Sequence, residues 1–355
     1  MVDVKVRADL ALRGVRVTAP VVRSKGAGPT DDGHVVVDGV AMALPLSADS
    51  PWSIVDGLLF HDEDPVDGLG MVAAVDRPHF YDLTTADGVP YEKLAKLHGN
   101  TVLATTVVQT CIRYDESTRC RFCAIEESLK AGATTRVKTP AQLAEVAEAA
   151  VRLDGITQLV MTSGTSAAAD RGARYLARCA AAVHAAVPHL PIQVQCEPPA
   201  DPFAVFRDLR DNGVTAIGIH IEALDQQVRE RWTPGKAEVS IAEYEHAWQE
   251  AVRVFGWNRV STYVLVGLGE DPDELVAGCE RLIAMGVYPF VVPFRPIEGT
   301  LAVADDGAVA PSPDVLVDVT GRVASLLQAA GMVGAEQGAG CAACGACSAL
   351  SVVGG

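Results

Sequence analysis

The strongest constraint on how this chain folds is a regular alternation of short apolar segments with longer amphipathic ones, which begins near residue 101. The short segments are rich in β-branched residues, whereas the longer ones repeat their apolar residues every three or four positions, as a half-buried helix does. Strands are expected at residues 101–110, 157–163, 191–197, 215–224, 259–270 and 287–294. Helices are expected at residues 139–155, 169–187, 201–213, 240–256, 271–286 and 312–331. Such alternation predicts parallel strands with helices outside them, in a doubly wound sheet or a barrel.

Polar residues at the ends of the expected strands favour the barrel. Each strand is apolar along its length and becomes polar where it ends, as the catalytic face of a β/α barrel does. An open sheet would instead gather its ligand-binding residues at one switch point. Five successive strands contribute such residues, and a cysteine-rich loop follows the first of them. The groups on the second to fifth strands are, in order, Thr162, Ser163, Gly164 and Thr165; Gln193, Gln195 and Glu197; His220 and Glu222; and Gly267, Gly269 and Glu270. The expected fold is therefore α/β, with a full or partial TIM-type (β/α) barrel.

Three regions follow from the change in composition along the chain. Residues 1–100 are rich in glycine, proline and aspartate and contain short strand-like pieces such as "HVVVDGVAMALPL", which predict a small β-containing N-terminal region. Residues 101–330 form the expected barrel, and residues 331–355 form a C-terminal Cys-rich tail.

Charge and hydropathy exclude several classes of partner. The formal net charge is −16 and no basic block is present, so a nucleic-acid partner is not expected. The first residues interleave charged with apolar side chains, unlike a signal peptide, and no apolar run is long enough to span a bilayer. We therefore expect a cytoplasmic protein with no membrane contact.

The nine cysteines indicate metal binding rather than a disulfide framework, because six of them fall in two tight triplets. Cys111, Cys120 and Cys123 form the first triplet, directly after the first strand. Structural zinc takes four closed ligands, whereas three cysteines can hold a [4Fe–4S] cluster and leave one iron open. A zinc loop and unligated core cysteines remain the alternatives.

The segment "CRFC" and the place of its loop after the first barrel strand resemble the radical S-adenosylmethionine (radical SAM) superfamily. That resemblance implies that the open iron binds SAM. It further implies that an electron from the cluster cleaves SAM to methionine and a 5′-deoxyadenosyl radical, which abstracts hydrogen from a substrate. The spacing departs from the family pattern, since eight residues rather than the usual three separate Cys111 from Cys120.

The resemblance extends to later strand ends and implies contacts to SAM there. "TSGT" stands where the family places a glycine-containing turn against the SAM amino group, and "HIEALD" resembles the fourth-strand pattern of the biotin synthase-like branch. "VLVGLGE" resembles the fifth-strand segment that packs on adenine. The SAM-binding residues implied are Phe122, Ser163, Gly164, Glu197, Glu222, Leu265, Val266 and Gly267.

Cys341, Cys344 and Cys347 form the second triplet, with the tight spacing that bacterial ferredoxins use for three irons of a [4Fe–4S] cluster. A second iron–sulfur cluster is expected there, and an adventitious zinc site is the alternative. Cys196, at a strand end, is the best candidate for an outside ligand, whereas Cys179 and Cys279 lie on apolar helix faces and are expected in the core. We expect the tail to fold back over the open mouth of the barrel.

Over nearly its whole length the chain also resembles the radical SAM protein family of a conserved bacterial gene cluster that encodes a nitrilase. This resemblance implies a small-molecule substrate, nitrile- or amide-related, and an electron donor such as flavodoxin or ferredoxin. Residues expected to face the substrate are Tyr114, Gln195, His220 and Arg295. The alternatives are a non-enzymatic iron–sulfur or zinc protein, acting as scaffold or electron relay, and a zinc hydrolase, which usually needs histidine and carboxylate ligands that do not cluster here.

Overall fold

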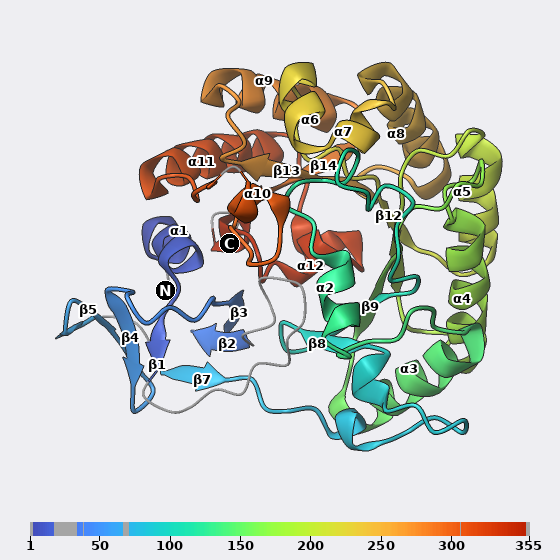
Figure 1. Ribbon diagram of the computed structural model, residues 1–355, viewed down its shortest axis with the longest axis horizontal. Helices are drawn as coiled ribbons and strands as arrows, with labels where there is room; N and C mark the ends of the chain where they lie inside the picture. The colour runs from blue at the N-terminus through green and yellow to red at the C-terminus, as the bar shows by residue number, and fades with distance from the viewer. Residues whose placement is uncertain (1–2, 18–33, 38, 67–70, 306, 353–355) are drawn as a thin grey trace.

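The computed structural model describes residues 3–17, 34–37, 39–66, 71–305 and 307–352. Its central feature is a seven-stranded sheet in the order β14-β13-β12-β11-β10-β9-β8. The strands are β8 (Lys96–His98), β9 (Val102–Thr106), β10 (Gln158–Thr162), β11 (Ile192–Gln195), β12 (Ala216–Gly218), β13 (Val260–Val266) and β14 (Val287–Pro293). All neighbouring pairs are parallel except β8, which runs antiparallel to β9 at one edge. The sheet curls into an arc without pairing its two edge strands, so the predicted barrel is confirmed in its partial form (Figure 1).

Six long helices cover the outer face of this sheet (Figure 1). They are α3 (Pro140–Asp154), α4 (Ala173–Ala186), α5 (Pro202–Asp211), α8 (Ile241–Phe255), α9 (Pro272–Ala284) and α11 (Pro313–Ala329). Local signals set their ends: Thr139 caps α3 by accepting a hydrogen bond from the Gln142 backbone N–H, and Gly155 ends it in the left-handed conformation. The expected alternation of strands and helices is therefore confirmed.

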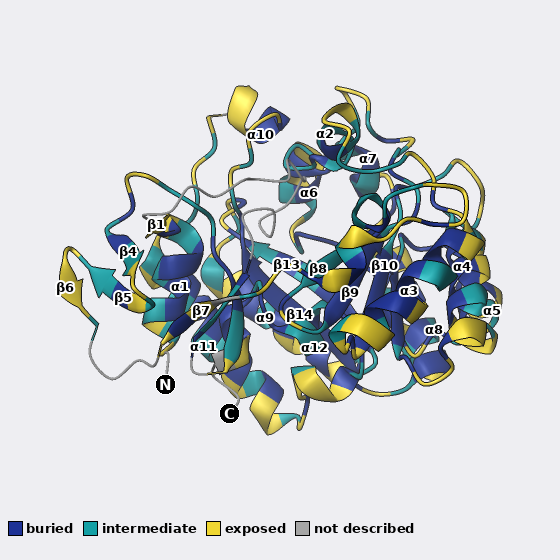
Figure 2. Cartoon of the chain, turned by 90° about the horizontal axis from the view of Figure 1, so that it is seen from below, coloured by how far each residue is buried: buried dark blue, intermediate teal, exposed yellow. Residues whose placement is uncertain are grey.

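Short helices gather at the carboxyl ends of the strands, above the first cysteine loop. They are α2 (Ile125–Lys130), α6 (Gln226–Trp232), α7 (Pro234–Ala237) and α10 (Leu301–Ala304). Figure 2 shows them together on one side of the sheet, whereas α12 (Cys341–Cys344) lies toward the other side. The side with α2, α6, α7 and α10 is the mouth of the barrel.

The N-terminal region contains strands, as expected, but also begins with a helix that was not expected, α1 (Val4–Arg13). Its two small sheets have the orders β1-β4-β5-β6 and β3-β2-β7. The strands are β1 (Arg16–Val17), β2 (His34–Val37), β3 (Val40–Ala43), β4 (Trp52–Val55), β5 (Leu58–His61), β6 (Asp64–Pro65) and β7 (Val72–Ala74). Helix α1 packs against α11 and so joins this region to the barrel (Figure 1).

We keep the division into residues 1–100, 101–330 and 331–355 as a proposal. Strand β8 at Lys96–His98 already belongs to the barrel sheet, and the tail packs inside the barrel, so neither end region is separate from it. Among the described residues, the helices are all too short or too polar to cross a bilayer.

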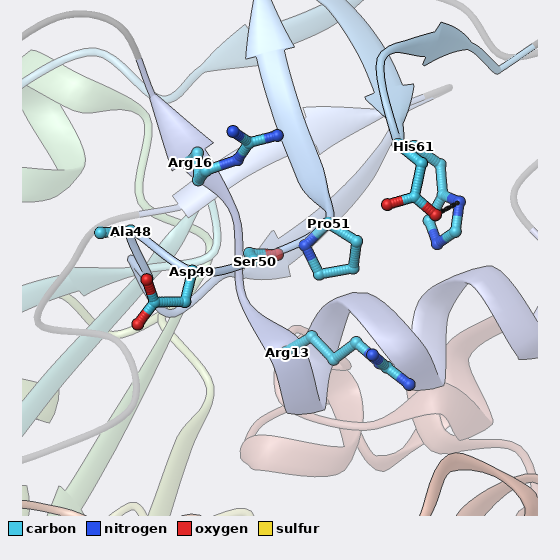
Figure 3. A pocket seen from close by; sticks show the side chains of 8 residues that line it. Arg13, Arg16, Ala48, Asp49, Ser50, Pro51 and His61 are labelled. Atoms are coloured by element: carbon cyan, nitrogen blue, oxygen red, sulfur yellow. Dashed lines mark ion pairs between the residues drawn. The ribbon is translucent and has the colours of Figure 1, made fainter.

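A pocket of about 610 Å³ lies in the N-terminal region (Figure 3). Its lining residues are Arg13, Arg16, Ala48, Asp49, Ser50, Pro51, His61 and Asp62, so the barrel does not contribute to it. The pocket therefore lies apart from both cysteine triplets.

Candidate active site

The first triplet lies on the loop that leaves β9 at the mouth of the barrel. The Cys123 backbone N–H donates to the Cys120 carbonyl at 2.9 Å, which places these two cysteines in one tight turn. Burial raises the pKa of the Cys123 thiol to about 11, and the nearby Cys111 raises it further. Burial also raises the pKa of the Cys120 thiol, and the nearby Cys123 contributes to this rise. The three half-buried cysteines are therefore close neighbours.

The residues between Cys111 and Cys120 form an ordered loop with its own anchor. The Arg113 guanidinium donates from Nε to both Glu197 oxygens, at 3.1 Å each, and both side chains are buried. The Thr165 hydroxyl also donates to Glu197, at 2.6 Å. The carboxylate at the end of β11 therefore holds the inserted loop, and Arg113, which sequence analysis did not single out, is the partner that explains its burial.

A second contact fixes the far side of the same loop. The Gly235 backbone N–H donates to the Thr118 carbonyl at 2.9 Å, and a Cβ at Gly235 would lie 2.5 Å from that oxygen. Asp115 closes a turn inside the loop by accepting from the Ser117 backbone N–H at 3.1 Å. The unusual eight-residue spacing is thus accommodated by contacts that the inserted residues make themselves.

Gly164 brings the turn after β10 against the backbone of the cysteine loop. Its N–H donates to the Val108 carbonyl at 2.8 Å, and a Cβ at this position would lie 2.1 Å from the Thr110 oxygen and 3.1 Å from the Cys111 Cα. The Ser163 hydroxyl donates to the Gly164 carbonyl at 3.0 Å. A glycine is therefore required here by close approach.

Replacing Gly164 by alanine is expected to displace Cys111, because backbone atoms cannot move aside as a flexible side chain can. We expect a loss of stability of about 1–3 kcal/mol and a reduced iron content at the first triplet. Thermal unfolding and iron analysis of anaerobically purified protein measure the two effects. Gly321→Ala in α11 is the matched control, since a Cβ there meets nothing within 4 Å; an equal response of the two variants would contradict the argument.

Glu222 lies just beyond β12 in a conformation that non-glycine residues seldom adopt, with φ of 72°. Its carboxylate pairs with the Lys236 ammonium at 3.0 Å, and both side chains are largely buried. Lys236 also donates to the His220 carbonyl at 3.1 Å, and the charge of Glu222 raises the lysine's pKa against the lowering effect of burial. Lys236 stands in the segment "RERWTPGKA", but only the fold shows that it meets Glu222.

An apolar cluster covers the mouth beside the cysteine loop. Phe122 and Leu265, both among the implied SAM-binding residues, pack in it together with Trp232 and Phe294. Val266 is buried in the main core instead, so its side chain faces away from this cluster. Gly267 has φ of 110°, which allows β13 to end in a tight turn.

The second triplet lies inside the partial barrel. The Gly340 N–H donates to the Gln158 side chain at 2.7 Å, and Gln158 begins β10. The Gln195 amide donates to the Cys341 Sγ at 3.3 Å, from the end of β11. In Figure 1 α12 stands within the arc of strands, and in Figure 2 it lies on the side away from α2 and α7. The expectation that the tail folds back over the mouth is wrong, because the tail enters the barrel from the opposite end.

Buried arginines accompany this triplet. Arg7 of α1 donates from Nη2 to the carbonyls of Gly345 at 2.9 Å and Ala346 at 3.0 Å, and from Nε to that of Ser348 at 3.1 Å. Burial lowers the pKa of Arg7 to about 10, and the nearby Cys347 and Cys344 oppose this change. Burial likewise lowers the pKa of Arg295, and the nearby Cys347 opposes this lowering. Arg7 was missed by sequence analysis because nothing local links α1 to the tail.

A continuous series of contacts joins the two triplets. The His220 ring stacks on Tyr263 with centroids 4.2 Å apart, and the Tyr263 backbone N–H donates to His220 Nδ1 at 3.1 Å. Tyr263 is in turn hydrogen-bonded to Cys341. The carbonyl of His220 accepts from Lys236, which pairs with Glu222 beside the first triplet.

The remaining candidates are placed as follows. The Tyr114 hydroxyl donates to the Cys123 carbonyl at 3.4 Å, so Tyr114 belongs to the first triplet's own loop. Cys179 and Cys279 are fully buried in the core, as expected. Burial raises the pKa of the Cys196 thiol to about 12, and its role as an outside ligand stays a prediction.

Part of this sequence matches a known protein family. The sequence pattern of the radical SAM superfamily matches residues 117–282. Residues 117–282 are thus similar to the radical SAM superfamily. The matched stretch contains Cys120 and Cys123 but begins after Cys111, in the loop whose spacing is unusual. Members of this superfamily use a [4Fe–4S] cluster and SAM, which agrees with the cofactors expected from sequence.

Individual relatives are distant. Bacteriochlorophyllide c C-7(1)-hydroxylase of Chlorobaculum limnaeum is 30% identical over 131 residues, which are 36% of this chain and 31% of that protein. The structure of methylornithine synthase aligns with a TM-score of 0.49 and 17% identity, over 64% of this chain and 62% of its own. Coproporphyrinogen III oxidase from Escherichia coli, a radical SAM enzyme, has a TM-score of 0.40 and 14% identity, over 65% of this chain and 52% of its own. This chain thus spans about a third of the curated relative and less than two thirds of either structure.

No group of three or more histidine, cysteine, aspartate or glutamate side chains within the described ranges is close enough to hold a single metal ion. A zinc ion binds all its ligands at once, whereas each iron of a cluster takes its own thiolate, so cluster ligands lie farther apart. Three half-buried thiols fit an iron–sulfur cluster by their chemistry.

Proposed function

We propose that this chain is a radical SAM enzyme acting on a small molecule, with its reactive centre at the first triplet. The observation that supports this most is the meeting of three strand ends there: the cysteine loop after β9, the Gly164 turn after β10 and Glu222 after β12. When bound, a [4Fe–4S] cluster supplies the electron that cleaves SAM into methionine and a 5′-deoxyadenosyl radical, which abstracts hydrogen from the substrate.

In this proposal Cys111, Cys120 and Cys123 bind the cluster, and the Ser163–Gly164 turn offers backbone groups to SAM. The apolar cluster around Phe122 and Leu265 excludes water from the adenine side. Glu222 presents its carboxylate to SAM, and Lys236 holds that carboxylate in place. Glu197 acts indirectly, because its oxygens already accept from Arg113 and Thr165.

The substrate that we propose is a neutral polar molecule of the nitrile- or amide-related class. His220 accepts a hydrogen bond at Nδ1, and burial lowers its pKa to about 3, so the neutral ring carries its proton on Nε2. This Nε2 is buried and has no hydrogen-bond partner among the described residues. It can donate to a nitrile nitrogen or an amide oxygen, and the Gln195 side chain lies nearby.

We also propose that the enzyme works in the cytoplasm, with a one-electron donor such as a flavodoxin or ferredoxin. A purely structural or electron-relay role is not favoured, since it gives no reason for a strained, ion-paired Glu222 and a close glycine turn at the same mouth.

The test is an anaerobic assay with reduced protein, dithionite and SAM, in which 5′-deoxyadenosine is quantified by chromatography. We expect its release at a rate above that of protein without reductant. Reconstituted, iron-loaded protein that releases none would contradict the proposal.

Replacing Glu222 by glutamine is expected to weaken SAM binding by about tenfold to a hundredfold, because a hydrogen bond to a charged group contributes about 1.5–3 kcal/mol. Equilibrium dialysis of SAM against anaerobic, reconstituted protein measures this. Glutamine can still accept a hydrogen bond from Lys236. Glu238→Gln removes an exposed carboxylate from the neighbouring segment and is the control. If Glu222→Gln binds SAM with unchanged affinity, the Glu222 carboxylate pairs with Lys236 and does not contact SAM.

A further inference from the structure

The backbone around the second triplet brings its three thiols together. The Cys344 N–H donates to the Gly340 carbonyl and the Gly345 N–H to the Cys341 carbonyl, each at 2.9 Å. Gly340 and Gly345 have φ of 115° and 68°, so the chain reverses on both sides of α12. Each of the three thiols lies near enough to another to sense its charge. The short helix and its two glycines thus direct three thiols to one place.

The surroundings of this triplet carry unbalanced positive charge. All three guanidinium nitrogens of Arg295 are buried, and none has a hydrogen-bond partner among the described residues. Arg295 lies within electrostatic reach of Cys347. Nη1 of Arg7 is likewise buried without a described partner. A buried guanidinium without a partner is costly, so an anionic group is expected beside it.

Neutral amides and close backbone complete the enclosure. A Cβ at Gly340 would lie 2.1 Å from the Gln193 amide nitrogen, so the tail is seated tightly on β11. A Cβ at Gly99 would lie 3.3 Å from the Cys344 Sγ. The Gln195 amide donates toward Cys341. The set offers three sulfur ligands, hydrogen-bond donors and two cations.

We propose that Cys341, Cys344 and Cys347 bind a second iron–sulfur cluster inside the barrel, and that Arg7 and Arg295 supply its counter-charge. Thiolates select iron–sulfur clusters and zinc, and three thiolates on a cluster give a net negative group that matches two buried guanidiniums. A structural zinc site would require a fourth ligand. The stacked pair Tyr263 and His220 would connect this cluster to the ion pair of Lys236 and Glu222.

Iron content after anaerobic reconstitution tests the site, separately from SAM chemistry. Wild-type protein is expected to hold about eight iron per chain, and each triple alanine variant, of the first or of the second triplet, about four. If the first-triplet variant holds no iron, the tail binds no cluster and this proposal is wrong. If the tail variant holds none, the first site is empty and the proposed function fails instead. Stoichiometric zinc in place of tail iron would overturn the proposal as well.

Arg295 is tested by a readout that a merely structural arginine would not change. Arg295→Gln is expected to keep about eight iron but to make the second cluster harder to reduce, because reduction adds negative charge that the guanidinium offsets. A redox titration followed by electron paramagnetic resonance measures this potential, with the first triplet replaced by alanine so that one cluster remains. Arg295→Lys should restore most of the potential. An unchanged potential in Arg295→Gln would remove Arg295 from the proposal.

Discussion

Protein in which Cys111, Cys120 and Cys123 are all alanine is expected to lose 5′-deoxyadenosine release by about a thousandfold or more. That loss corresponds to about 4 kcal/mol of transition-state stabilisation and places the rate at background. The physical reason is that, in the proposed function, the electron for SAM cleavage comes from a cluster bound at these thiolates.

The comparison protein for this experiment is Cys179→Ala, which removes a fully buried thiol from α4 in the core. It should keep its 5′-deoxyadenosine release and lose only a little stability. The thermal unfolding of both variants should be recorded, so that loss of activity can be separated from loss of fold. A first-triplet variant that is folded and still releases 5′-deoxyadenosine would show that the reactive cluster is elsewhere.

The second large effect concerns the buried ion pair between Arg113 and Glu197. Replacing Glu197 by glutamine is expected to lower the free energy of unfolding by about 3–5 kcal/mol, because the Arg113 guanidinium stays buried without its charge partner. The only other carboxylate that it contacts among the described residues, Glu238, is largely exposed and compensates little. Denaturant unfolding under anaerobic conditions measures the change.

A double-mutant cycle makes this prediction specific. Arg113→Met should cost a similar amount, and the double variant less than the sum, since it leaves neither charge unpaired. The exposed pair Arg152 and Glu148 of α3 is the control, and its removal should cost about 0.5 kcal/mol or less. If Glu197→Gln instead keeps its stability and loses SAM affinity, Glu197 contacts SAM directly, as the family resemblance first implied.

Sequence reasoning reached the barrel because its signals are local. The capping of α3 by Thr139 and Gly155 depends on neighbours within a few residues, and the apolar repeat of each helix selects the face that packs on the sheet. The strands followed for the same reason. Strand β8 was not foreseen, since it is held by pairing with β9. Helix α1 was not foreseen either, although Asp3 caps its start and Gly14 ends it.

The candidate site was predictable only in its parts. Each cysteine triplet lies within a short stretch of sequence, so its spacing can be read directly. The strand-end position of Glu222 follows from the alternation of strands and helices. The roles of Arg113 and Lys236 were not readable. A charged residue in a loop is usually exposed, and only tertiary contacts show which one is buried against which carboxylate.

The sequence alone determined that this chain forms a parallel β/α arrangement and carries two sets of three thiols, because periodicity, caps and cysteine spacing act over short distances. Only the tertiary structure decided where the tail goes. Its path depends on Arg7 and Gln158, which are far from it along the chain and meet it through hydrogen bonds. Contacts of that separation leave no local pattern, so the fold alone brings the second triplet into the barrel and Arg295 beside it.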